Sequence, residues 1–227
     1  EINNIFDQEF VNEMHERGVL VTPFLSNHWG RKRAQNALSK PEVLASEVAN
    51  AVEKYNLDGV NIDLENLTMN DRDKLTEFVK ILREKLGDTK ILSVAVAANP
   101  NKLNRTWIAV YDYAGLAEFA DYLVLMAYDE HSAGGSAGPV ASINFVKISI
   151  EVILEDVSRD KVVLGIPLYG RIWGEGKEYG GEAVIISQVE KIAKRYKTVG
   201  IFEEKTGTPT ITIDVKNGDK KAYVNGK

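Results

Sequence analysis

Residues 58–65 read DGVNIDLE, and in this run polar side chains alternate with apolar ones. Side chains point to opposite faces along a β-strand, so Asn61, Asp63 and Glu65 would share one face while the apolar residues share the other. Three polar groups on the inward face of a buried strand are expensive without a purpose. We therefore take this stretch as the first candidate for a functional site.

Four other apolar runs have the near-continuous hydrophobic character of strands covered on both faces, as in a parallel sheet. Together the five predicted strands lie at 18–27, 58–65, 90–98, 121–129 and 161–170. Helical periodicity predicts helices at 41–55, 71–86 and 143–155. Pro41 suits a first helical turn, Asn70 suits an N-cap and Gly87 suits a C-terminal stop. This cadence of strand, helix and strand predicts βαβ units.

The polar residues inside the second strand favour a (β/α)8 TIM barrel, an α/β fold whose lumen can hold them, over a doubly wound sheet. A Rossmann-type sheet would need a glycine-rich phosphate turn, and the sequence contains no GxGxxG or Walker A motif. About five barrel strands are recognisable where a closed barrel has eight. We therefore expect the barrel to be incomplete in this chain, with a truncated N-terminus.

The pattern changes after Trp173. A glycine-rich stretch leads to a predicted helix near 187–197 and then to two alternating segments, TPTITIDV and KKAYVNG. Between them, Asn217-Gly218 is a hairpin-turn signal. We therefore divide the chain into a barrel portion, 1–174, which would carry the site, and a small α+β insertion, 175–227, which would also be truncated.

Composition limits the possible partners. The 227 residues are 44% hydrophobic and 27% charged, which is typical of a soluble globular protein with a substantial core. The net charge of −5 comes from mixed acidic and basic residues, so we expect no nucleic-acid partner. No apolar stretch approaches the ~20 residues that span a bilayer, and the chain has no cysteine. We also expect a monomer without a cofactor or metal.

The spacing of the Asp63 and Glu65 carboxylates indicates acid–base chemistry. Asp63 and Glu65 would lie roughly 7 Å apart along the strand, and like charges in a confined site raise one of the two pKa values. A protonated acid beside an ionised one is what cleavage of a glycosidic bond requires. Two alternatives remain: the acids could pair with basic residues of neighbouring strands, or they could bind a metal together with His28 and His131.

Three segments carry a resemblance to a known family. DGVNIDLE resembles the DGxDxDxE signature of glycoside hydrolase family 18, the chitinase-like (β/α)8 enzymes. MAYDE (126–130) resembles the MxYD strand of that family, and GIPLYGR (165–171) resembles the strand that precedes its inserted α+β domain. The resemblance implies that the first two strands and the last strand of the barrel are absent here.

The resemblance also implies roles for individual residues. Glu65 would donate a proton to the leaving oxygen, and Asp63 would orient the N-acetyl group, whose carbonyl oxygen attacks the anomeric carbon in a retaining, substrate-assisted reaction. Tyr128 would complete the catalytic set by a hydrogen bond to the acetamido group. The substrate-binding residues would be Asn61, Met126, Asp129 and Tyr169.

Asn61 departs from the family, in which most chitinases carry Asp at this position. A neutral amide cannot share a proton with Asp63, but it can still form a hydrogen bond with it. Asn61 together with YDEH is more similar to the bacterial spore-cortex branch, whose substrate is peptidoglycan. The resemblance therefore favours an extracellular, wall- or spore-associated enzyme acting on peptidoglycan ahead of chitin.

Two other classes stay open at this point. This fold also hosts lectin-like sugar-binding proteins without activity, although such relatives commonly lose the acid that is present here as Glu65. The chain could also be an interaction module of a larger surface protein.

Overall fold

The computed structural model describes residues 7–174, 180–213 and 220–224. The chain forms two compact units. The first consists of Glu1–Leu125 with Val152–Val163, and the second of Met126–Glu151 with Leu164–Lys227.

The first unit is built on a five-stranded parallel sheet whose strands follow one another in chain order. The strands are β1 (Phe24–Ser26), β2 (Gly59–Asp63), β3 (Ile91–Ala97), β4 (Tyr122–Met126) and β5 (Val162–Leu164). In the parallel pairs β1–β2 and β2–β3, Ser26 lies opposite Asp63, and Asn61 lies opposite Ser93. The parallel sheet confirms the predicted α/β fold of an incomplete barrel, and among the described residues β1 and β5 do not pair with each other.

Two predicted strands differ from the observed ones. The strand predicted at 18–27 shortens to β1, and the run predicted at 161–170 splits into β5 and the start of β6 (Tyr169–Gly174), which belongs to another sheet. Pro167 lies between the two pieces and has no N–H to give to a sheet ladder. Hydrophobicity continues through this break, which explains why the sequence predicts one strand.

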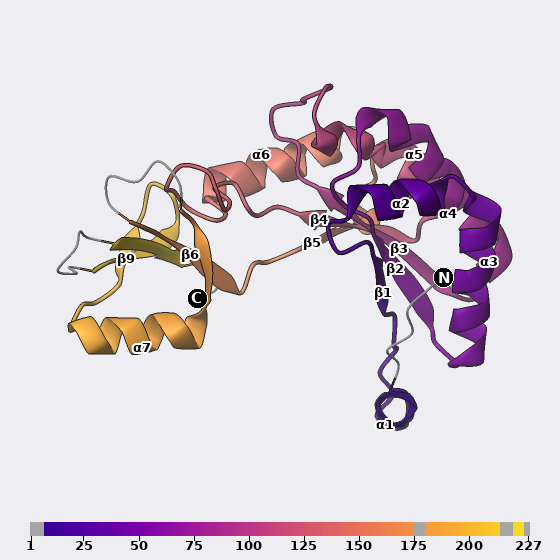
Figure 1. Ribbon diagram of the computed structural model, residues 1–227, viewed down its shortest axis with the longest axis horizontal. Helices are drawn as coiled ribbons and strands as arrows, with labels where there is room; N and C mark the ends of the chain where they lie inside the picture. The colour runs from indigo at the N-terminus through magenta and orange to yellow at the C-terminus, as the bar shows by residue number, and fades with distance from the viewer. Residues whose placement is uncertain (1–6, 175–179, 214–219, 225–227) are drawn as a thin grey trace. The chain divides into compact units, whose positions relative to one another are not determined.

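Four helices lie on one side of this sheet, whereas α1 (Gln8–Glu16) lies apart from it (Figure 1). The four are α2 (Arg31–Leu38), α3 (Pro41–Lys54), α4 (Arg72–Leu86) and α5 (Tyr113–Phe119), with short 3₁₀ turns at Met69–Asp71, Trp107–Val110 and Arg159–Lys161. α3 and α4 pack against each other. Phe78 and Leu82 of α4 and Ile62 of β2 are fully buried, so the apolar face of β2 belongs to the core beneath these helices.

The predicted ends of the helices are mostly confirmed. Pro41 occupies the first turn of α3, and Gly87 ends α4 with a φ of 65°, which glycine adopts without strain. Asn70 as the N-cap of α4 is wrong. A 3₁₀ turn precedes the helix there, and Thr68 and Asp71 form its capping box instead.

The second unit holds an antiparallel sheet in the order β7–β6–β10–β9–β8, together with α6 (Ile143–Ile153), whose last two residues belong to the first unit, and α7 (Ile186–Tyr196). Besides β6, its strands are β7 (Glu182–Ile185), β8 (Ile201–Glu203), β9 (Thr208–Ile213) and β10 (Lys220–Val224). Val189 of α7 packs with Val184, Ile211 and Ile213 in a small core of its own. The predicted helices at 143–155 and 187–197 are confirmed, whereas Asn217-Gly218 lies outside the described residues.

In the described part of the chain, every helix is too short or too polar to cross a lipid bilayer.

Gly59 sets the distance between β2 and β3. A Cβ atom at this position would meet the backbone oxygen of Ile91 at 2.0 Å, a contact that only a shift of the strand can relieve. We expect Gly59→Ala to lower the free energy of unfolding by about 1–3 kcal/mol, the usual cost of overpacking, as measured by urea unfolding. Gly200→Ala is the control, because a Cβ there meets its nearest atoms at 3.8 Å. Equal unfolding midpoints for the two variants would contradict this account of the strand spacing.

Candidate active site

The predicted site residues fall into two groups, one in each unit. Asn61 and Asp63 lie on β2, and Glu65 follows two positions after the strand ends. Val60 and Ile62 are buried on the opposite face, with 5% and 0% exposure, while Asn61 and Asp63 are half buried. The alternation of DGVNIDLE along a strand is therefore confirmed.

Asp63 carries a buried carboxylate oxygen that lacks a donor. Its Oδ1 has no hydrogen-bond partner among the residues that the structure describes. Burial raises the pKa of Asp63 above its ordinary value of 3.8, and the positive charge of His28 offsets part of this rise. An unsatisfied buried acceptor costs about 1–3 kcal/mol, and such groups concentrate at functional sites.

Asn61 is fixed by a neighbour on β3. The hydroxyl of Ser93, which is 1% exposed, donates to Asn61 Oδ1 at 2.8 Å. The bond follows from the register, which sets these two residues opposite each other. It leaves the amide NH₂ of Asn61 as the end that can donate elsewhere.

The segment that carries Glu65 is bound on two sides by buried side chains. Asn27 bonds both backbone groups of Glu65: Oδ1 accepts from its N–H at 2.9 Å, and Nδ2 donates to its C=O at 2.8 Å. The Tyr111 hydroxyl donates to the carbonyl of Leu64 at 3.1 Å. Burial, together with the negative charges of Glu65 and Asp63, raises the pKa of Tyr111, so its hydroxyl stays protonated.

The second group centres on Asp129. Its Oδ1 accepts from the Tyr169 hydroxyl at 2.5 Å and from Arg171 Nε and Nη2 at 3.0 and 2.9 Å. This forked ion pair fixes the orientation of the Asp129 carboxylate. The backbone of Asp129 is left-handed, with a φ of 59°. Burial and the adjacent Asp129 raise the pKa of Tyr169.

Tyr128 and Tyr169 meet edge to face, with ring centroids 6.3 Å apart. Met126 is the last residue of β4 and is half buried. The structure thus brings Tyr128, Asp129 and Tyr169 together within the second unit, as it brings Asn61, Asp63 and Glu65 together in the first.

The proposed alternatives find little support. In the described ranges, no three His, Cys, Asp or Glu side chains gather as metal ligands would. His131 instead bonds the backbone oxygen of Ser136 through Nδ1 at 3.1 Å. The ion pairs seen among the described residues, such as those of Asp58, Asp112 and Asp129, do not involve Asp63.

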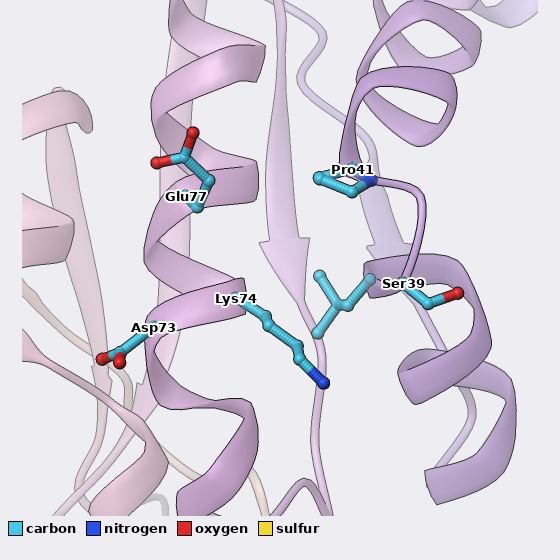
Figure 2. Close-up of a pocket in the computed structure, with 6 residues that line it drawn as sticks. Ser39, Pro41, Asp73, Lys74 and Glu77 are labelled. Atoms are coloured by element: carbon cyan, nitrogen blue, oxygen red, sulfur yellow. The ribbon is translucent and has the colours of Figure 1, made fainter.

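A shallow hollow of about 530 Å³ lies among the outer helices, between the α2–α3 turn and α4. Figure 2 shows Lys74 extending from α4 toward this turn, where Ser39 and Pro41 lie. None of the predicted site residues lines it. We therefore do not assign the site to this hollow.

The sequence analysis missed four residues of these groups: Asn27, Ser93, Tyr111 and Arg171. Ser93 and Asn27 could have been suspected, because each is a polar residue inside or at the end of an apolar strand run. Arg171 belongs to the GIPLYGR segment but received no role. Tyr111 gives no signal in the sequence, since it lies in a 3₁₀ and loop region outside the predicted elements.

Comparison with known proteins gives a family. The model of "Glycosyl hydrolases family 18" matches residues 30–226. A Bacillus subtilis (strain 168) protein named "Putative sporulation-specific glycosylase YdhD" is 33% identical over 183 residues, which is 78% of this chain and 43% of that protein. The "Cortical fragment-lytic enzyme" of the same strain is 30% identical over 134 residues, 57% of this chain and 31% of that enzyme.

The crystal structure of Bacillus subtilis YdhD superposes with a TM-score of 0.93 at 25% identity, covering 100% of this chain and 79% of the other. The chain spans about half the length of the curated relatives it matches.

Burial of Asp63 makes stability depend on pH. Its pKa is higher in the folded state than in the unfolded chain, so stability falls as pH rises from 3.8 through the raised value. We expect Asp63→Asn to raise the melting temperature at pH 7, by about 2–4 °C if about 1 kcal/mol is relieved. The gain should disappear below pH 3.8.

Thermal melts between pH 3 and pH 8 measure this difference. Asp88→Asn serves as the control, because Asp88 is exposed in the loop after α4. A gain that is constant with pH, or one that Asp88→Asn also gives, would show that the burial of Asp63 carries no electrostatic cost.

Proposed function

Because this chain belongs to family 18 of the glycosyl hydrolases, we propose that it hydrolyses β-1,4 glycosidic bonds after N-acetylglucosamine, with retention of configuration and with assistance from the substrate. The family supplies the class of reaction. The residues of this chain supply the arguments for the mechanism.

One observation carries the proposal: the buried Oδ1 of Asp63 has no hydrogen-bond donor in the described part of the chain. An acetamido group offers an N–H that can satisfy this oxygen. The bond would hold the acetamido carbonyl oxygen toward the anomeric carbon and increase its electron density. Asp63 would therefore act by positioning and electrostatics, without forming a bond to carbon.

In the first step, the acetamido carbonyl oxygen attacks the anomeric carbon while Glu65 gives its proton to the departing glycosidic oxygen. The C–O bond to the leaving sugar breaks, and a cyclic oxazolinium ion forms. The negative charge of Asp63 stabilises this cation. Burial raises the pKa of Asp63 because the empty site disfavours a negative charge. The positively charged oxazolinium ring removes this penalty, so the ionised carboxylate is stabilised more with the intermediate than with the neutral substrate.

In the second step, Glu65 is ionised and takes a proton from water. The water oxygen attacks the anomeric carbon from the face that the leaving group vacated, and the ring opens to restore the acetamide. Two inversions give net retention. Glu65 ends protonated and ready for the next cycle.

For the second unit we propose binding roles. The Tyr128 hydroxyl would bond the acetamido oxygen, and Asp129 would contact a sugar hydroxyl. The Arg171 fork supports this role, because it holds the Asp129 carboxylate in one orientation with oxygen lone pairs remaining. Tyr169, bonded to the same carboxylate, and Met126 would border the sugar.

Peptidoglycan is our first choice of polymer, ahead of chitin. Two relatives carry names that refer to sporulation or to cortical fragments, and Asn61 replaces the Asp of most chitinases. We accordingly propose that the protein acts outside the cell, in the wall or spore cortex.

The first test replaces the acid. We expect Glu65→Gln in the full chain to lower kcat by about 10²–10⁴-fold, the usual contribution of general acid–base catalysis, while the affinity for an oligosaccharide changes little. Glu77→Gln is the control, because Glu77 is exposed on α4. Turnover of N-acetylglucosamine oligomers and of spore-cortex fragments measures the effect. Retention of more than about a tenth of the wild-type rate would remove Glu65 from the mechanism.

The second test concerns the acetyl group. If the substrate's own oxygen is the nucleophile, turnover should disappear with de-N-acetylated oligomers, and a thiazoline that mimics the cyclic intermediate should inhibit competitively. Steady-state kinetics with matched acetylated and deacetylated substrates give the answer. Efficient cleavage of the deacetylated polymer, or an ester trapped on Asp63, would refute substrate assistance even if glycosidase activity were found.

A further inference from the structure

We propose that Asn27 is a positioning residue for the catalytic acid: its side-chain amide replaces the last rung of the β1–β2 ladder and thereby fixes the backbone of Glu65. The inference rests on the proposed function of Glu65. Nothing in the DGVNIDLE signature or in the family match assigns a role to position 27.

The ladder shows which rung is replaced. The N–H of Asn61 donates to the carbonyl of Pro23 at 2.9 Å. Both strands of a parallel pair advance two residues per rung on the same side, so two rungs further along the ladder the N–H of Glu65 would meet the backbone carbonyl of Asn27. That carbonyl is occupied, since it accepts from the N–H of Gly30 at 2.9 Å.

The chain leaves β1 at this point in a tight turn. His28 and Trp29 have φ values of 46° and 63°, and the Asn27-to-Gly30 hydrogen bond closes the turn. Positive φ at both central positions is the pattern of a type I′ turn, which glycine and asparagine usually supply. Such a backbone is strained for His and Trp. After this turn the N–H of Trp29 is no longer in line to bond the carbonyl of Glu65.

The Asn27 side chain takes over both bonds. A carboxamide has the same donor and acceptor as a peptide unit, and here it receives the N–H of Glu65 and donates to its C=O. These two partners allow only one orientation of the amide, because the N–H can only donate and the carbonyl can only accept. At 2% exposure, Asn27 makes these bonds away from water.

These two hydrogen bonds fix the backbone of Glu65 and thereby place its carboxyl group for catalysis. β2 ends at Asp63, so the backbone at Glu65 has left the regular ladder. Small errors in the position of an acid cost large factors in rate, about 10²-fold for a misplacement of 1 Å. Asn27 does not contact the glycosidic oxygen in this proposal; it acts only through Glu65.

The test compares a leaving group that needs a proton from Glu65 with one that does not. A sugar leaving group must be protonated, whereas 2,4-dinitrophenolate departs without a proton. In the full chain, we expect Asn27→Leu, which keeps the volume and removes both bonds, to lower kcat on N-acetylchitotetraose by about 10²-fold. On 2,4-dinitrophenyl N,N′-diacetylchitobioside, the same variant should lower the rate of the first step, in which 2,4-dinitrophenolate is released, by less than about threefold. Asn27→Ala should give the same contrast.

Arg83→Met is the matched control. Arg83 is a partly buried side chain that bonds the backbone carbonyls of Phe119, Gly87 and Lys90 near the start of β3 and β4, at the opposite end of the sheet. Its loss should destabilise the first unit while lowering the rates on both probes by the same small factor. Equal losses on both probes for Asn27→Leu would overturn the proposal, because a purely structural defect has this pattern.

A second measurement needs neither a variant nor activity. The Glu65 amide should exchange slowly with deuterium in the native wild-type protein, because its partner is the buried Asn27 Oδ1. Fast exchange at Glu65, beside a protected Asn61 amide, would also overturn the proposal. If the wild type cleaves neither probe, the proposed function fails, and amide exchange alone then decides whether Asn27 holds this segment.

Discussion

The parallel pairing of β2 with a strand on each side is the constraint on which the site depends. Register decides which side chains meet: Asn61 lies opposite Ser93, and Asp63 lies opposite Ser26. Because the period of a strand is two, a slip of one residue would send the carboxylate into the helix-covered core and Ile62 into the opposite face. Burial of the apolar face under α3 and α4 makes that slip prohibitively expensive.

The same constraint explains why Asp63 is both costly and useful. Backbone pairing holds Asp63 in place although its Oδ1 has no donor in the described residues. The free-energy cost of this unsatisfied acceptor is offset by the stability of the surrounding core. In contrast, the Asp129 carboxylate in the second unit already accepts hydrogen bonds from Arg171 and Tyr169. One carboxylate is thus left ready for a donor from outside, and the other is fixed by donors from inside.

Local patterns predicted the parts of the fold that local patterns control. The strand at 58–65 and the helices at 41–55 and 71–86 follow from periodicity and terminal residues alone. The split at Pro167 and the capping by Asp71 depend on hydrogen bonding that hydrophobicity does not report. The contacts of Glu65 with Asn27, 38 positions away, could not be predicted, because nothing in either segment specifies the distance between them. The family resemblance supplied roles for Asp63 and Glu65, whereas their supporting residues required the structure.

The amide of Asn27 has an evolutionary consequence. Ordinary rungs of a sheet survive almost any substitution, because every residue except proline brings the same N–H and C=O. At Glu65, the two hydrogen bonds to the backbone come from the Asn27 side chain instead. A single substitution at position 27 can therefore remove both bonds. Selection can therefore tune the acid, or silence it on the way to a protein that only binds sugar, while leaving every letter of DGVNIDLE intact.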